Sequence, residues 1–580
     1  MSRPISILGI NCTYHESAAC LIQDGQIIAA AEEERFTRIK HSKPARVNNA
    51  DQLPEHAIAF CLEYAGIKDI SELDFIGYSL NPEERFYKNT HYRSGYKIPD
   101  GDYGTLKGEQ TFYQSNLNVE KKIRAKGYQG RFFYLDHHDC HAASIFYVSG
   151  YHDSAIIVLD GIAEFESSSF LKGEGTRFRR IRYDSFPNSI GFLWEKMAMY
   201  FGFTEYDAAK VMGLASYGEA GVFKEAMDQL IQVDDRGHFI INDSVMQLRN
   251  LNFEHIEAIF GVPKLNAPIK DVTPENQVYA DIAYALQAIT EEIILKLARQ
   301  LRKETLSEHL CMAGGVTLNC VANGKLAYQQ ILENFYVQPA AHDAGTAIGA
   351  AYLIWHHKLG YPRRPVTKSP YLGPEYSNEQ ILAVLQQYRD QHNIKYQYHE
   401  DIEPVTAQIL AKGLIVAWFQ GRMEIGPRAL GNRSLLADPR LSDVRELMNN
   451  QVKHREPFRP FCPSVLVEKA ADWFELPDPI PDVADYMLGA FKAKKNKAKL
   501  IPAVVHIDGT SRIQSVRKET NPRFHRLITE MERHTGIPIL LNTSFNVQEP
   551  IVCSPEDAVK TFLKTRIDHL AIGNYLVTKM

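Results

Sequence analysis

The chain of 580 residues lacks paired cysteines: its eight cysteines are scattered, and none forms a CxxC motif. This absence argues against a zinc ribbon and a disulfide framework, and it favours a cytoplasmic location, where thiols stay reduced. We expect the cysteines to be small buried hydrophobic residues. A run of 18 apolar residues is also missing, so we expect no transmembrane helix and no membrane partner.

A strong charge of either sign is missing too. Lys and Arg number 65 against 70 Asp and Glu, which gives a formal net charge of −5. A chain so close to neutral is a poor general binder of nucleic acid, although one local basic pocket is compatible with this balance. The 45% hydrophobic and 23% charged residues are ordinary for globular proteins and exclude a wholly disordered or fibrous chain.

Domain organisation follows from length and from one proline-rich segment. At roughly 150 residues per domain the length suggests about four domains, and two or three large ones fit equally well. Residues 360–376 (GYPRRPVTKSPYLGPEY) contain four prolines and are the best linker candidate in the chain. We therefore predict one domain over residues 1–362, a linker over 363–375 and a second domain over 376–580.

Alternating strand and helix patterns predict an α/β fold in both domains. The chain begins with three strand-like segments, and Asp24-Gly25 is the hairpin turn between the second and the third. Residues 81–130 are rich in Tyr, Lys, Arg and Gly and have little periodicity, which indicates an insertion or a substrate-facing excursion. No internal repeat is visible in the sequence.

Two histidines and two aspartates predict a metal site. His137 and His141 are four residues apart on an expected helix, so both imidazoles lie on one face. Asp160 follows a predicted strand, and Asp343 follows another at the start of a helix, which is where ligands gather in α/β sheets. Such a nitrogen and oxygen donor set suits iron, manganese or zinc. For the two histidines alone, a pair of core or capping residues is the alternative.

Glycine-rich turns accompany these residues. Gly314 and Gly315 (MAGGVTLN, 312–319) stand between a strand and a helix start, where glycine lets the backbone approach a base or sugar closely. The segment 343–346 (DAGT) is a second glycine-containing turn between a predicted strand and a helix start. Together with residues 8–11, these turns suggest a ribonuclease-H-like ATPase fold; purely structural turns are the alternative.

The C-terminal half contains many arginines set among Gly, Pro and aromatic residues. Arginine forks beside small hydroxyls and amides are what phosphate oxygens require. Glycine, proline and aromatic residues around the arginines indicate rigid loops, which favours an anion site. Ordinary surface charge is the alternative. The segments concerned are 421–440, 453–460, 508–512 and 542–546.

The ordered motifs of nearly the whole chain resemble the O-carbamoyltransferases of antibiotic and nodulation-factor biosynthesis. The resemblance is specific because so many motifs occur in order. They are ILGINCTYHESAACL, EEERFTRIKH, DHHDCHAAS, VLDG, KVMGLASYG, GGVTLN, DAGTAIGAA, GPRALGNRS, PFRPFCPS, DGTSRIQSV and LNTSFN.

This resemblance implies an enzyme with two active sites. The N-terminal domain would have the ribonuclease-H-like fold of actin, sugar kinases and Hsp70, similar to the threonylcarbamoyl-transferases of tRNA modification. The C-terminal domain would be a YrdC-like α/β domain that makes carbamoyl adenylate from carbamoyl phosphate and ATP, supplied with magnesium. The first domain would then pass the carbamoyl group to a hydroxyl of a small natural product.

The resemblance also implies residue roles. The metal would be iron(II), or manganese or another divalent ion, held by His137, His141, Asp160 and Asp343. ATP and carbamoyl phosphate would contact Arg428, Lys453, Arg459, Arg512, Asn542 and Ser544. The nucleotide site of the first domain would use Gly191, Glu195, Lys210, Gly314, Gly315 and Asn319, although SIGFLWEK stands here where relatives have a GEAFDK pattern.

The acceptor hydroxyl needs a base, and an imidazole has the right pKa range. His15, in the turn after the first strand, is our candidate, with a structural turn histidine as the alternative. Lys40 is expected to face the acceptor. Tyrosines of the 81–130 segment are expected to shape the acceptor pocket, since tyrosine stacks on or hydrogen-bonds polar molecules.

Two other functions remain open at this point. One is a carbamoyl transferase with a macromolecular acceptor, which the missing CxxC motifs and the net charge of −5 disfavour. The other is a metal- and nucleotide-binding regulator without catalysis. For the first reading we expect only small-molecule partners, no nucleic acid, and a homodimer as the working oligomeric state.

Overall fold

A computed structural model describes residues 3–580 of the chain. It divides into two compact units, the first formed by Met1–Ala322 and Gln329–Lys368, the second by Asn323–Tyr328 and Ser369–Met580. The chain passes from the first unit to the second after Ala322, returns after Tyr328, and passes to the second again after Lys368.

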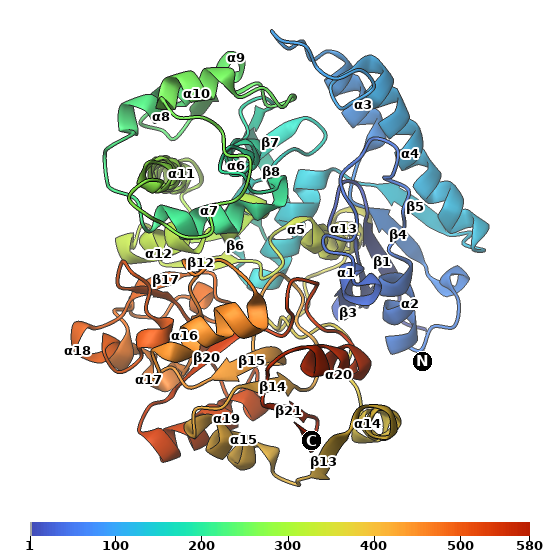
Figure 1. Ribbon diagram of the computed structural model, residues 1–580. Helices are drawn as coiled ribbons and strands as arrows, with labels where there is room; N and C mark the ends of the chain where they lie inside the picture. Colours follow the sequence, from blue (N-terminus) through green and yellow to red (C-terminus); the bar gives the residue numbers. More distant parts are fainter. Residues whose placement is uncertain (1–2) are drawn as a thin grey trace. The chain divides into compact units, whose positions relative to one another are not determined.

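The first unit begins with a five-stranded sheet in the order β3-β2-β1-β4-β5 (Figure 1). The first three strands form antiparallel hairpins, and β4 and β5 run parallel to β1. Asp24 and Gly25 make the tight turn between β2 and β3, both with positive φ. The strands are β1 (Ser6–Asn11), β2 (Ala18–Gln23), β3 (Gln26–Glu32), β4 (Phe75–Tyr78) and β5 (Arg131–Tyr134).

A second sheet repeats this plan, in the order β12-β11-β6-β7-β8. Again three strands are antiparallel and two more run parallel to the first of them. This duplicated order is the ribonuclease-H-like arrangement, so the predicted α/β fold is confirmed. The two sheets are a structural repeat, although no internal repeat is visible in the sequence. The strands are β6 (Asp153–Leu159), β7 (Glu166–Glu174), β8 (Arg177–Ser185), β11 (His309–Ala313) and β12 (Asn334–Val337).

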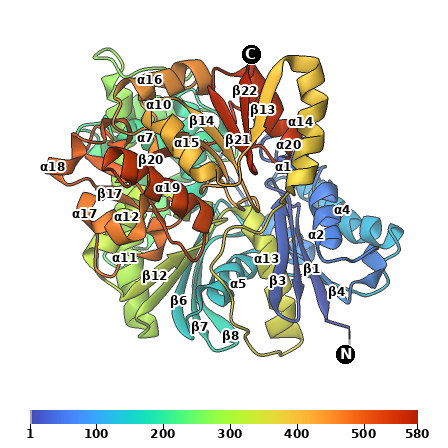
Figure 2. The same ribbon diagram turned by 90° about the horizontal axis from the view of Figure 1, so that it is seen from below.

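Two buried helices, α5 (His137–Ser149) and α13 (Thr346–Leu353), lie between the two sheets (Figure 2). Helix α13 packs on β1, α5 packs on β11, and the helices pack on each other. Their contact depends on Gly349, because a Cβ there would lie 1.7 Å from the carbonyl oxygen of Cys140. Only glycine permits this approach. It places the turn before α13 against the first turns of α5.

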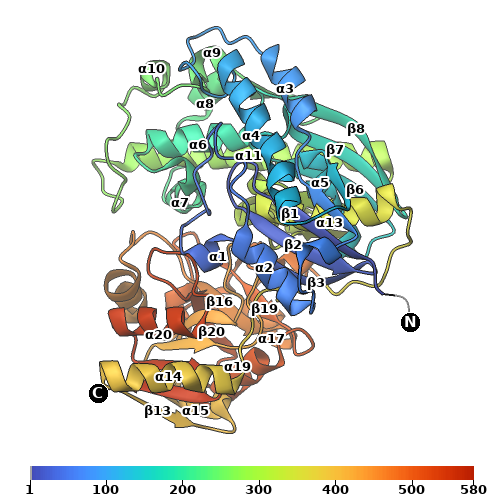
Figure 3. The same ribbon diagram turned by 90° about the vertical axis from the view of Figure 1, so that its right-hand side faces the viewer.

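The 81–130 segment corrects our expectation of irregular structure. It contains α3 (Pro82–Thr90) and the 20-residue helix α4 (Leu106–Ala125), which pack together (Figure 3). Thr105 caps α4 by accepting a hydrogen bond from the Gly108 N–H. The buried face of α4 has helical spacing but mixes Phe112, Val119 and Ile123 with Ser115 and Asn116, so its periodicity is weak in the sequence.

The second unit is built on a mixed eight-stranded sheet in the order β13-β22-β21-β14-β15-β20-β16-β19. Helices α15 (Ile402–Ala411) and α19 (Pro522–Thr535) pack on each other and share a core with the sheet, centred on Trp418 and Phe524. The strands are β13 (Ile394–Tyr398), β14 (Val416–Phe419), β15 (Arg433–Ala437), β16 (Cys462–Leu466), β19 (Gln514–Val516), β20 (Ile539–Ser544), β21 (His569–Ile572) and β22 (Tyr575–Lys579).

The cysteines and the apolar helices bear on two of the sequence-based expectations. All eight cysteines are buried and free of disulfides. Within residues 3–580, no helix is both long enough and apolar enough to cross a membrane.

Candidate metal centre and anion site

The structure brings together the four predicted metal ligands. One atom from each of His137, His141, Asp160 and Asp343 lies within 4.8 Å of all the others. The Nε2 atoms of the two histidines are 3.5 Å and 3.4 Å from Asp160 Oδ2. They are 3.6 Å and 3.7 Å from Asp343 Oδ1. All four residues are buried.

These distances fit a shared ion better than direct hydrogen bonds. Two ligands about 2.1 Å from one metal, at a tetrahedral angle, lie roughly 3.4 Å from each other. Both Nε2 atoms are buried and have no hydrogen-bond partner among the described residues. The other oxygen of Asp160 accepts the Gly315 N–H at 3.2 Å, which turns Oδ2 toward the imidazoles. The donor set therefore fits a divalent cation.

A further contact fixes the ring of His137. Its Nδ1 lies 2.9 Å from the carbonyl oxygen of Ser79, which requires the proton on Nδ1 and leaves the Nε2 lone pair facing the cluster. Glu164 accepts the backbone N–H of His137 at 3.1 Å. Burial, together with the charge of Asp136, raises the pKa of Glu164 to about 8. Sequence reasoning missed Glu164, since no motif marks it.

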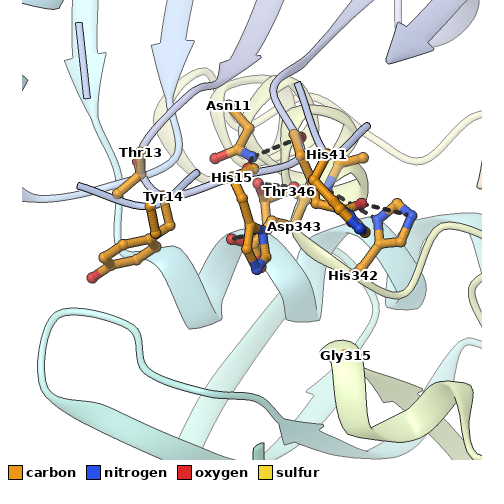
Figure 4. A network of polar contacts seen from close by, with 12 residues as sticks. Asn11, Thr13, Tyr14, His15, His41, Gly315, His342, Asp343 and Thr346 are labelled. Carbon is orange, nitrogen blue, oxygen red and sulfur yellow. Dashed lines mark hydrogen bonds and ion pairs between the residues drawn. The ribbon is translucent and has the colours of Figure 1, made fainter. Parts of the chain in front are cut away.

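His15 lies beside this cluster, in the turn after β1 (Figure 4). Its Nδ1 is 3.7 Å from Asp343 Oδ2, the oxygen that does not face the two histidines. The side-chain amide of Asn11 holds the turn by donating to the carbonyl oxygens of His15 and Glu16 at 3.2 Å and 3.1 Å. Lys40 is exposed after the short helix α1 (Glu34–Thr37), and the contacts of the described residues do not join it to the cluster.

A second group of carboxylates and a histidine was not predicted. His342 Nε2 lies 3.0 Å from Glu16 and 3.3 Å from Glu32. The two carboxylates outweigh the effect of burial and raise the pKa of His342 to about 9. Arg35 pairs with Glu32 at 2.6 Å, so the charges of the two carboxylates are balanced by His342 and Arg35. It fixes the residue next to Asp343 (Figure 4).

The three glycines of the predicted nucleotide site lie at the end of β6. A Cβ at Gly191 would meet the Asp160 carbonyl oxygen at 2.8 Å, and Gly315 donates to the Asp160 side chain. Gly314 has a φ of 92° and packs on the backbone of Leu159, where a Cβ would lie 2.2 Å from the carbonyl oxygen. Glycine is therefore required at 191 and 314, because the backbone at the end of β6 packs against both positions.

The other three residues of that predicted site have polar or charged neighbours of their own. Glu195, on α6 (Ile190–Tyr200), has its pKa raised to about 8 by burial and by the charge of Asp160. Asn319 exchanges hydrogen bonds with Gln287 at 2.9 Å and 3.1 Å. Lys210 pairs with Asp207 at 3.1 Å.

In the second unit, Lys453 and Ser544 are in direct contact. The buried Lys453 ammonium donates to the Ser544 hydroxyl at 3.2 Å and to its carbonyl oxygen. It also donates to the side chain of Asn546 at 2.8 Å. Asn542 lies deeper, where its amide donates to Ser464 and Gln514. These hydrogen bonds fix the Asn542 side chain between β16, β19 and β20.

Three arginines of the second unit lie together. Burial and the positive charges of Arg459 and Arg512 hold the pKa of Arg455 well below its usual range. Arg459 lies 3.6 Å from Glu456, and Arg512 donates to Cys462 Sγ at 3.0 Å. Arg428 is half-buried in the loop between β14 and β15. The sequence prediction omitted Arg455, although it lies between Lys453 and Arg459 in the same segment.

Two family models match the chain. The model described as Carbamoyltransferase N-terminus covers residues 6–352, and the one described as Carbamoyltransferase C-terminus covers residues 407–579. The chain therefore belongs to the carbamoyltransferase family and is a transferase, which confirms the resemblance seen in the motifs.

Curated relatives agree. The chain is 37% identical to the uncharacterized protein sll1178 of Synechocystis, over 99% of this chain and 96% of the relative. It is 36% identical to the nodulation protein NolNO of Sinorhizobium fredii, over 98% of this chain and 80% of the relative. It is 38% identical to NolO of Bradyrhizobium diazoefficiens, over 77% and 79%.

Solved structures are more distant. HypF of T. kodakarensis is 14% identical with a TM-score of 0.31, over 63% of this chain and 50% of that chain. The fold assignment therefore rests on the strand order of the two sheets.

Proposed function

We propose that the chain is an ATP-dependent O-carbamoyltransferase with two reaction sites, one in residues 1–362 and one in residues 376–580. In the C-terminal site, carbamoyl phosphate, ATP and one water give carbamoyl adenylate, pyrophosphate and phosphate. In the N-terminal site, the carbamoyl group passes to a hydroxyl of a small natural product, and AMP leaves. The observation that supports this most is the four-residue cluster of the first unit, in a chain of this family.

The cationic segment of the second unit suits the first reaction. Carbamoyl phosphate and the ATP phosphates are anions, and the positive charges of Arg459 and Arg512, together with burial, lower the pKa of Arg455. An anion placed among them relieves that repulsion. Lys453 supplies a further positive charge next to Ser544. Arg428 and Asn542 complete the proposed set.

The first unit suits the transfer step. His137, His141, Asp160 and Asp343 would hold iron(II), or manganese in its place. Such an ion supplies Lewis-acid polarisation of an acyl phosphate oxygen. The glycine-lined end of β6, with Glu195, Lys210 and Asn319 around it, would hold the adenylate.

A base is required for the acceptor hydroxyl, and His15 is our candidate. Its side chain is 24% exposed, and Asp343 lies against its Nδ1. The imidazole would take the hydroxyl proton as the C–O bond forms. Lys40 is exposed, and its proposed role is to contact the bound acceptor.

The test is pyrophosphate release from purified protein given ATP and carbamoyl phosphate without acceptor. We expect release above a control without enzyme, lost in Arg512→Ala and retained in His137→Ala. Lys499→Met, which changes an exposed lysine of the second unit, is the matched control. No release by the wild-type chain would refute the two-reaction scheme and favour a non-catalytic regulator.

A further inference from the structure

Arg249 is a partly buried arginine, and two of its guanidinium nitrogens are buried without a hydrogen-bond partner among the described residues. It follows the short helix α9 (Asp243–Met246), and its guanidinium points into a group of aromatic rings. The guanidinium carbon is 4.3 Å from the ring centroid of Phe186, 5.3 Å from that of Phe192 and 6.0 Å from that of Tyr103. Its Nε and Nη2 atoms are buried and donate no hydrogen bond to any residue that the structure describes.

The carboxylate of Glu109 does not pair with Arg249. The nearby carboxylate of Glu109 is engaged by Arg85, whose Nε and Nη2 donate to its two oxygens at 3.2 Å and 3.1 Å. Burial and the charge of Arg85 lower the pKa of Arg249. Leaving two buried guanidinium N–H groups without an acceptor is unfavourable, and this points to a ligand that supplies one.

A second open donor lies in the same place. The hydroxyl of Tyr103 is buried and has no hydrogen-bond partner within residues 3–580. The ring of Tyr103 stands between the two arginines, 5.8 Å from the guanidinium carbon of Arg85 and 6.0 Å from that of Arg249. An oxygen atom bound there could accept from Tyr103 and Arg249 together.

The loop that presents Arg249 is held in place. The hydroxyls of Tyr92 and Tyr96 donate to Asp243 at 2.7 Å and 3.1 Å. The Tyr96 hydroxyl in turn accepts the backbone N–H of Arg249 at 3.1 Å. The arginine is therefore positioned before any ligand arrives, as a binding site requires.

This aromatic site adjoins the metal-ligand cluster. The ring of Tyr14 lies 6.3 Å from that of Tyr103 and 6.0 Å from that of His137, centroid to centroid. On the other side, Phe192 would meet a Cβ at Gly161, the residue after Asp160, at 3.5 Å. One aromatic ring thus separates the open donors from the cluster.

We infer that Arg249 and Tyr103 bind an anionic oxygen group, a carboxylate or a phosphate ester, carried by the acceptor molecule. A guanidinium fork matches the paired oxygens of such groups. The rings of Phe186 and Phe192 would contact the apolar part beside it. The inference rests on the proposed function, because only a carbamoyl transfer needs an acceptor at this place.

Calorimetric titration of the full-length protein with benzoate, phenyl phosphate and neutral benzamide tests this. We expect benzoate to bind at least about tenfold more tightly than benzamide, and Arg249→Met to weaken benzoate at least about tenfold. Tyr103→Phe should weaken it several-fold. Arg236→Met, at an exposed loop arginine, should leave it unchanged. Tighter binding of phenyl phosphate than benzoate would identify the group as a phosphate.

Thermal unfolding gives a second readout. If Arg249 serves a ligand, Arg249→Met should unfold at a temperature no lower than Arg236→Met, because it removes buried N–H groups that have no acceptor among the described residues. A clearly lower temperature would make Arg249 structural and overturn the inference. So would equal benzoate affinity in wild type and Arg249→Met. Pyrophosphate release by the wild type is measured in parallel, and its absence overturns the proposed function alone.

Discussion

Replacing Gly349 by alanine should separate α5, which carries His137 and His141, from α13, which directly follows the turn of Asp343. The added Cβ would start 1.7 Å from the Cys140 carbonyl oxygen, whereas ordinary contacts begin at 3.4 Å. Helices α5 and α13 must then move apart by about the difference, 3.4 − 1.7 = 1.7 Å. The clash is with backbone and no side-chain rotamer relieves it, so we expect a loss of roughly 3 kcal/mol in the free energy of unfolding.

The same displacement should weaken metal binding. Asp343 stands just before α13, while His137 and His141 lie on α5. Metal sites tolerate ligand shifts of about 0.2 Å, so a shift several times larger should lower the affinity by about 100-fold.

The assay combines urea unfolding with the metal content of protein equilibrated with a limiting concentration of iron(II) or manganese. Gly95→Ala is the matched control, because nothing lies within 4 Å of a Cβ at that position. If Gly349→Ala matched Gly95→Ala in both measurements, the argument that helix packing builds the cluster would be refuted.

Two further predictions concern buried cations. Arg85→Met should lower the free energy of unfolding in urea by about 3–5 kcal/mol, because it leaves the buried Glu109 carboxylate without its partner. The double variant Arg85→Met with Glu109→Gln should recover most of that loss. An Arg85→Met variant as stable as the wild type would contradict this. Lys453→Met should lower pyrophosphate release by about 100-fold relative to Lys499→Met, since it removes a charge beside Ser544, and equal rates in the two variants would remove Lys453 from the site.

Sequence patterns located those parts of the molecule whose chemistry is local. The four-residue spacing of His137 and His141 placed both imidazoles on one face of α5. Asp160 and Asp343 were marked by their position after strands. The approach of Asp343 to the two histidines was not deducible from spacing, because it depends on the contact between Gly349 and Cys140, which are far apart in the sequence.

Features built from distant residues escaped the sequence analysis. Arg249 becomes notable only when Phe186 and Tyr103 surround it, and Glu164 only when it meets the backbone of His137. Helix α4 was missed because Ser115 and Asn116 occupy buried positions where apolar residues were expected.

The central claim is that carbamoyl adenylate forms in one site and is consumed in the other. The most direct measurement is mass spectrometry of an acid-quenched reaction of His137→Ala with ATP and carbamoyl phosphate. The account predicts carbamoyl adenylate bound to this variant and none in Arg512→Ala. Absence of the adenylate from His137→Ala, under conditions in which the wild-type chain consumes ATP, would contradict it.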